Sequence, residues 1–143
     1  MSVDKQQVIE DWFRRVWVEA DMDAIDEMFR QDSKAEGVLP GFDVGPDDFR
    51  EMASMYLALV EDPIVCVEKV MVDGDWAAAL WTMSILNPVS GERITGFGQL
   101  FVRFEGSIMV EAYNNFDLVA FFEKMGFLPE QTMAMCLTGQ KVA

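Results

Sequence analysis

The sequence predicts an α+β fold in which a cone-shaped, curved antiparallel sheet wraps around helices and encloses an apolar cavity. Apolar residues before Pro63 repeat with the period of amphipathic helices, and after Pro63 the period changes to two. The strand-like segments are separated by short turns, so consecutive strands are expected to be antiparallel neighbours. The expected element order is α-α-β-α-β-β-β-β-α, within one domain covering residues 1–143.

The first part of the chain predicts two helices and a short strand. Asp4 can cap the open amides of the first helix, whose apolar residues form one broad stripe: Val8, Ile9, Trp12, Phe13, Val16, Trp17 and Ala20. A second, short helix follows Asp21. Residues 34–39 have the pattern of a short strand, which Pro40 and Gly41 interrupt.

The remaining elements follow in order. A third helix begins at Gly45-Pro46, because proline suits the first helical position. Asp117 caps a helix that Gly126 ends, and a last helical turn starts at Pro129. Between these helices the period of two predicts four strands, over residues 64–72, 76–86, 93–104 and 107–115.

The composition excludes several kinds of chemistry. The chain has 11 Lys+Arg, 25 Asp+Glu, a net charge of −14 and no histidine. The charge argues against nucleic acid and anionic membranes as partners, and the missing histidine excludes Ser-His-Asp and Cys-His nucleophiles. The acidic run over residues 21–27 lacks the spacing of a calcium loop and suits a helix N-terminus. We therefore expect no metal and no cofactor.

The sequence also indicates where the protein is located and whether its cysteines are reduced. The segment MSVDKQQVIEDW has no apolar core like that of a signal peptide, and no stretch is apolar enough for a membrane span. Cys66 and Cys136 are far apart in sequence, in apolar surroundings, and are expected to be reduced and packed as small apolar residues. The chain is expected to be cytoplasmic.

Three segments resemble a known family: ADMDAIDEMF at residues 20–29, MVEAYNNFD at 109–117 and FFEKMGFLP at 121–129. With the order of elements, they resemble the nuclear transport factor 2-like superfamily, and within it the SnoaL-like polyketide cyclase branch. This resemblance implies a conical sheet around an apolar cavity. It implies less about function, because the family includes cyclases, isomerases, epoxide hydrolases, dehydratases and proteins without catalysis.

The catalytic residues of these enzymes are not matched here. The strand aspartate of the cyclases and isomerases falls on Leu100, and the epoxide hydrolase pair falls on Gly98 and Leu100. The isomerase tyrosine and second aspartate fall on Phe13 and Gly37. Scytalone-dehydratase-like chemistry requires histidines that the chain lacks. Whether the protein is an enzyme therefore stays open.

Glu36 is the best remaining catalytic candidate. A carboxylate in an apolar cavity has a raised pKa and can accept a proton from an acidic C–H group. The alternative is a solvated edge-strand glutamate beside Lys34. Asn114 has the inward phase of its strand, where its amide either orients a ligand carbonyl or satisfies neighbouring backbone groups.

The expected function is that of a small-molecule pocket protein. It either performs cyclase- or isomerase-type proton transfer on a hydrophobic carbonyl substrate, or is a non-catalytic ligand-binding or dimeric assembly module. Gln99 should face outward, on the sheet face through which the resemblance implies a homodimer. The large aromatic side chains of the helices and strands either pack in the hydrophobic core or form part of the ligand-binding surface. The residues expected around the ligand are Phe13, Trp17, Met52, Tyr56, Trp81, Met83, Leu100 and Asn114.

Overall fold

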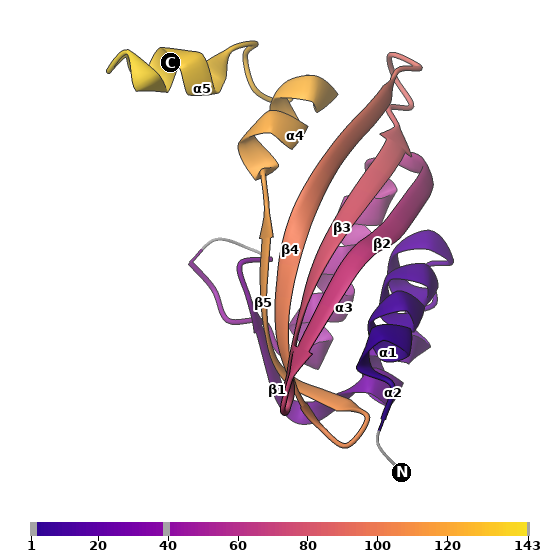
Figure 1. Cartoon of the computed structure of the whole chain (residues 1–143). Helices are drawn as coiled ribbons and strands as arrows, with labels where there is room; N and C mark the ends of the chain where they lie inside the picture. Colours follow the sequence, from indigo (N-terminus) through magenta and orange to yellow (C-terminus); the bar gives the residue numbers. More distant parts are fainter. Residues whose placement is uncertain (1–2, 39–40, 143) are drawn as a thin grey trace.

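The structure, a computed structural model, describes residues 3–38 and 41–142. Its helices pack against one face of a curved sheet and leave the other face uncovered (Figure 1). The α+β class is therefore confirmed. The elements in chain order are α1 (Lys5–Trp12), the π-helix η1 (Phe13–Val18), α2 (Asp23–Met28), β1 (Phe29–Glu36), α3 (Pro46–Ala58), β2 (Glu61–Asp73), β3 (Trp76–Leu86), β4 (Arg93–Glu105), β5 (Ile108–Phe116), α4 (Leu118–Met125) and α5 (Thr132–Leu137).

The sheet has the strand order β1-β5-β4-β3-β2. Strands β2 to β5 form the expected antiparallel meander. Strand β1 differs from the expectation of a wholly antiparallel sheet, since it pairs in parallel with β5, with Ala35 opposite Ala112. No short turn joins these two strands, so local sequence does not constrain their relative direction.

Strand β1 also begins earlier than the expected start at residue 34. It starts at Phe29, and its register shifts before Lys34. Ser33 occupies this irregularity: its buried hydroxyl donates to the carbonyl of Met109 at 2.8 Å and accepts from the amide of Arg30 at 3.0 Å. The expected strand end at residue 39 lies outside the described residues.

The helix ends match their sequence signals. The Asp4 carboxylate accepts from the Gln7 amide at 3.1 Å, and the Asp117 carboxylate accepts from the Ala120 amide at 3.0 Å. Gly126 ends α4 in the left-handed conformation, at φ +87°. The first helix differs in one respect, because it continues as the π-helix η1 in place of an α-helix.

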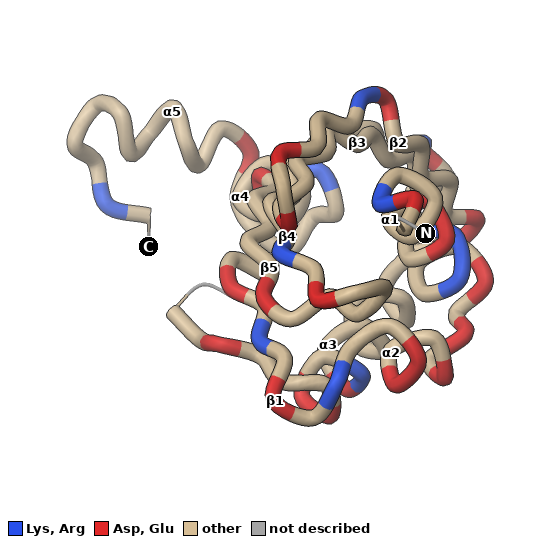
Figure 2. Tube along the Cα trace, turned by 60° about the horizontal axis from the view of Figure 1, so that its bottom comes forward, with Lys and Arg blue, Asp and Glu red and all other residues tan. Residues whose placement is uncertain are grey.

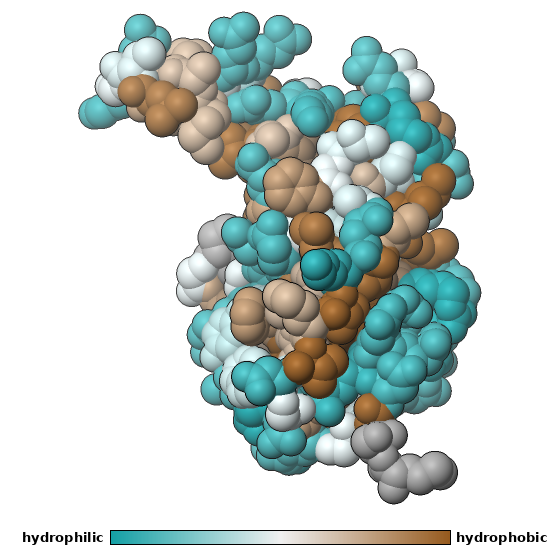
Figure 3. Space-filling model, in the orientation of Figure 1, coloured by the Kyte–Doolittle hydropathy of each residue, from teal (hydrophilic) through white to brown (hydrophobic). Residues whose placement is uncertain are grey.

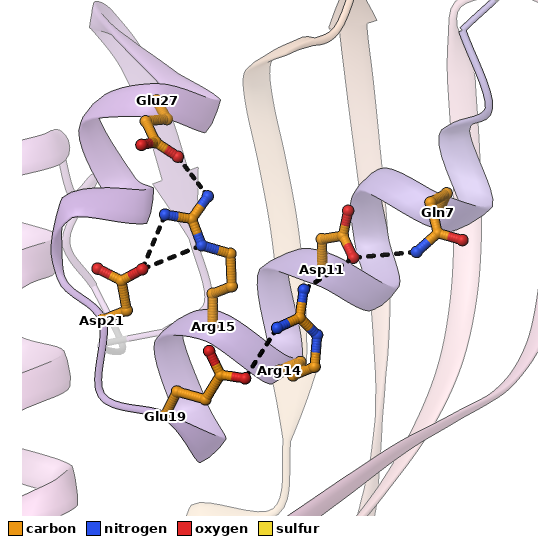
Figure 4. A network of polar contacts seen from close by, with 7 residues as sticks. All are labelled: Gln7, Asp11, Arg14, Arg15, Glu19, Asp21 and Glu27. Atoms are coloured by element: carbon orange, nitrogen blue, oxygen red, sulfur yellow. Dashed lines mark hydrogen bonds and ion pairs between the residues drawn. The ribbon is translucent and has the colours of Figure 1, made fainter.

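Arg15 ties η1 to α2 (Figure 4). Its guanidinium donates twice to Asp21, at 2.7 and 3.0 Å, and also pairs with Glu27. Two carboxylates of the acidic run, those of Asp21 and Glu27, thus neutralise an arginine on η1, and Asp26 pairs with Arg50 on α3. The Arg15 guanidinium lowers the pKa of Asp21.

An ion pair joins Arg103 and Glu111 across β4 and β5, with Nε and Oε1 2.6 Å apart. The cysteines correct an expectation: both are free, as expected, but both are exposed, Cys66 on β2 and Cys136 on α5. Within the described residues, no helix is both long and apolar enough to span a bilayer.

Candidate functional site

A cavity of about 120 Å³ lies between the inner face of the sheet and the helices. Helices η1, α3 and α4 and strands β2, β3 and β5 all contribute side chains to it. No charged side chain is among its lining residues, which are Phe13, Trp17, Gly37, Val38, Tyr56, Leu57, Val60, Pro63, Val65, Trp81, Met83, Ile85, Asn114, Phe116, Leu118 and Phe121.

Asn114 is the main polar group of this cavity. The indole N–H of Trp81 donates to Asn114 Oδ1 at 3.1 Å. Because an indole nitrogen only donates, this bond fixes the orientation of the amide. Among the described residues, Asn114 Nδ2 forms no hydrogen bond, so its two N–H groups are available to a ligand acceptor.

Two glycines hold the Trp81–Asn114 pair in place. A Cβ on Gly98 would lie 2.3 Å from Trp81 Cζ2, so the indole can lie across the backbone only where no side chain is present. Gly37 has φ +83°, and a Cβ there would lie 1.9 Å from the carbonyl oxygen of Asn114. Both positions therefore require the absence of a side chain.

Gly96 and Gly98 on β4 leave room beside the backbone, and aromatic rings occupy that room. Trp81 covers Gly98, and the Phe116 ring would lie 3.1 Å from a Cβ on Gly96. The Trp81 and Phe116 rings stack with centroids 5.4 Å apart, and Phe13 packs on Trp81 at 5.3 Å. The protein's own rings thus fill much of the space beneath the sheet, which explains the small volume.

Tyr56 also lines the cavity and contributes a hydroxyl group. Its O–H donates to the backbone carbonyl of Val38 at 3.3 Å, and burial raises its pKa. The phenol therefore stays protonated near neutral pH. It can accept a hydrogen bond from a ligand, but it is a poor base.

Glu36 does not line the cavity. It is exposed at the end of β1, where Ala35 and Val44 exchange backbone hydrogen bonds of 2.9 Å and bring the Glu36 and Asp43 side chains together. The hydrogen bond with Asp43, and then the repulsion between the two carboxylates, raise the pKa of Glu36. The geometry matches the alternative of a solvated edge-strand glutamate.

The other expected ligand-binding residues fall into two groups. Phe13, Trp17, Tyr56, Trp81, Met83 and Asn114 line the cavity together. Leu100 is buried on the inward face of β4 but does not line it, and Met52 faces a second hollow between α3 and α4.

Sequence reasoning missed the contribution of β2, α4 and the loop before α3. Phe116 and Phe121 lie in the segments that carry the family resemblance, and their aromatic character was the available signal. Val38 and Pro63 had no such signal, because they lie at the ends of elements and only the tertiary fold brings them to the cavity.

The curved sheet, the helices on one face and the apolar cavity define a protein of the nuclear transport factor 2-like class. The SnoaL-like domain family matches residues 9–112, and the chain belongs to this family. Among curated proteins, none matches the sequence significantly.

Solved structures with the same fold confirm the class. The chain is similar to IdmH, a candidate polyketide cyclase from Streptomyces antibioticus, with a TM-score of 0.77, 14% identity and coverage of 87% of this chain and 99% of that one. It is also similar to TsrD from Streptomyces laurentii, with a TM-score of 0.71, 22% identity and coverage of 86% and 95%. A candidate polyketide cyclase from Acidithiobacillus ferrooxidans has a TM-score of 0.70, 19% identity and coverage of 88% and 98%.

Proposed function

We propose that the protein binds a small apolar molecule with a carbonyl group, and that Asn114 Nδ2 donates to the carbonyl oxygen. The observation that carries this proposal is the Trp81–Asn114 hydrogen bond, which leaves the amide N–H groups facing an otherwise apolar cavity. Asn114 is half-buried, and a hydrogen bond from its amide to a ligand acceptor contributes about 0.5–1.5 kcal/mol.

The volume sets the size of the ligand. Pockets for drug-sized molecules usually have about 300–1,000 Å³, whereas an apolar cavity of about 150 Å³ holds benzene. The cavity of about 120 Å³ therefore suits a single-ring ligand as it stands. A polyketide-like ligand requires that side chains such as Trp17 and Phe121 move outward.

A paired ligand experiment tests the binding mode. Acetophenone and α-methylstyrene have nearly the same shape, but only acetophenone has a carbonyl oxygen. We expect calorimetry to show tighter binding of acetophenone, by about fivefold for one hydrogen bond of about 1 kcal/mol. Asn114→Asp keeps an acceptor for the Trp81 N–H and removes the amide donor, so this preference should disappear. An unchanged preference in Asn114→Asp would rule out Asn114 as the ligand donor.

The second candidate is cyclase- or isomerase-type proton transfer on the same kind of ligand. The Asn114 amide favours it, because a donor in an apolar site stabilises the negative charge that develops on a carbonyl oxygen. The described lining residues offer no carboxylate or other good base. Non-catalytic binding is therefore the better supported function.

Proton exchange distinguishes the two candidates. In D₂O, an enzyme of this type would accelerate deuterium uptake at the methyl group of acetophenone, which NMR measures. We expect no acceleration over buffer. Acceleration that Glu36→Gln abolishes would restore the catalytic role of Glu36, and acceleration that survives Glu36→Gln would assign catalysis to another group.

For the partner, we propose a second copy of the chain, paired through the outer face of the sheet. The outward positions in the middle of the central strands carry no charge, in a chain of net charge −14, whereas Arg93 and Arg103 lie near the two ends of β4. The uncharged positions are Ala78, Leu80, Thr82 and Ser84 on β3 and Thr95, Phe97, Gln99 and Phe101 on β4. Beside these positions, the Glu68 carboxylate on β2 accepts a hydrogen bond from the Thr82 hydroxyl at 2.8 Å. An uncharged surface is where two strongly acidic molecules can meet with least repulsion.

A further inference from the structure

Helices α4 and α5 form an arm that lies beyond the family match, which ends at residue 112. Helix α4 packs against β4, whereas α5 packs chiefly against α4. Figure 1 shows α5 projecting away from the sheet. Within the arm, α5 has no charged residue, in contrast to the acidic helices at the other end of the molecule (Figure 2).

The joint between the two helices is fixed by hydrogen bonds. The Phe127 amide donates to the carbonyl of Phe122 at 2.9 Å, directly after the left-handed Gly126. The Glu123 carboxylate accepts from the Met133 amide at 2.9 Å, and the Thr132 hydroxyl donates to the carbonyl of Pro129 at 2.5 Å. The angle of α5 is therefore set by the chain itself.

Helix α5 exposes apolar side chains that its own chain does not cover. It has six residues, whereas isolated helices shorter than about 12–15 residues are marginal in water. Leu137 is 81% exposed, and Met133 is exposed as well. A short apolar helix held away from the body requires a surface to pack on.

The outer sheet face is such a surface. Phe97 is 62% exposed on it, and Leu80 and Phe101 are also exposed. Figure 3 shows an apolar band along this face of the sheet and apolar surface on the arm. Between the arm and the sheet lies a groove of about 1170 Å³, whose walls include Met133 on the arm side and Cys66, Phe97 and Gln99 on the sheet side.

The groove and the ligand cavity share part of their walls. Gly37, Met83, Phe116, Leu118 and Phe121 line both. These shared residues have contact with both the cavity and the groove. A molecule that fills the groove would therefore contact residues that also line the cavity.

We propose that a second copy fills the groove with its own outer sheet face, that the arm of each copy lies over the sheet of the other, and that the partner thereby completes the cavity wall. This inference rests on the proposed function for its ligand. The arrangement is isologous, since each copy contributes both the sheet face and the arm. Dimerisation and ligand binding are then coupled, and each strengthens the other.

The test uses the full chain and three substitutions that each add one negative charge at an exposed position. Phe97→Asp changes the sheet face and Leu137→Asp changes the arm. Val89→Asp is the matched control, because Val89 is 93% exposed in the turn between β3 and β4 and lines neither hollow. Sedimentation velocity measures dimerisation, calorimetry measures acetophenone binding, and circular dichroism verifies folding.

We expect Phe97→Asp and Leu137→Asp each to weaken the dimer by about tenfold or more, as for an apolar contact residue, and to weaken acetophenone binding with it. Val89→Asp should leave both unchanged. A dimer that survives Leu137→Asp would overturn the role of the arm. Dimer loss with unchanged acetophenone binding would overturn the closure of the cavity while leaving the proposed function intact. A wild-type dimer that binds no acetophenone would refute the proposed function and the closure, and sedimentation would still decide the role of the arm.

Discussion

At the scale of single residues, the arrangement of the cavity depends on a glycine, Gly98, which has no side chain. Gly98 lets the Trp81 indole lie on β4, and the indole N–H then orients Asn114. The sequence indicated that Asn114 faces inward. It did not indicate that Trp81 takes the room beside Gly98, because β3 and β4 must first align Trp81 with Gly98.

Gly98→Ala tests this dependence. The added Cβ would approach both Trp81 and the backbone oxygen of Asn115, at 2.6 Å, so the indole or the strand must move. Overpacking of this kind lowers the free energy of unfolding by about 1–3 kcal/mol, which urea denaturation measures. Gly96→Ala is the control on the same strand face, since the nearest atoms to its added Cβ, on the Phe116 and Met83 side chains, lie at 3.1 Å or more, and it should be less destabilising. Equal losses in the two variants would contradict a specific role for Gly98.

Glu36 and Asp43 give a prediction about pH. The pKa of Glu36 is raised in the folded protein, so its contribution to stability is present below the unfolded-state pKa and is lost as pH rises through the folded-state pKa. Glu36→Gln removes the repulsion from Asp43 and should raise the melting temperature near neutral pH. The difference should vanish in acid, where the carboxyl is protonated. A lower melting temperature near neutral pH would show that the Glu36 carboxylate is stabilising.

At the scale of elements, local patterns predicted the meander well and β1 poorly. The period of two indicated β3 over residues 76–86, as observed, because both of its ends are marked by turns. Strand β1 has three consecutive exposed residues, 30–32, before its buried Ser33, so its first half shows no alternation. Its parallel pairing with β5 joins residues far apart in sequence, which no local pattern encodes.

Arg15 gives a prediction at this scale, because it joins η1 to α2. Arg15→Met removes the contacts with Asp21 and Glu27, so thermal unfolding should begin at a lower temperature. The pKa of Asp21 is lowered in the folded protein, so this pair's stabilisation is present above the unfolded-state pKa and lost as pH falls through the folded-state pKa. The effect of Arg15→Met should therefore diminish in acid. Arg14→Met is the control, since its partners Asp11 and Glu19 tie no second helix; a larger loss in Arg14→Met would contradict the role of Arg15.

At the scale of the whole molecule, net charge opposes the proposed pairing. Two copies of charge −14 repel each other, and salt screens this repulsion. We therefore expect sedimentation to show about twice the monomer mass at micromolar concentration, with a dimer that becomes tighter as salt concentration rises. A dimer that weakens with salt would indicate an interface held by ion pairs, such as those of Arg93 and Arg103, and not by the uncharged face.

The indoles of Trp17 and Trp81 both line the cavity, and that of Trp81 is bonded to the amide proposed to hold the ligand. Any molecule that enters must alter the surroundings of at least one of these fluorophores. The protein thus contains its own optical sensor, and a library of unlabelled compounds can be screened by emission alone.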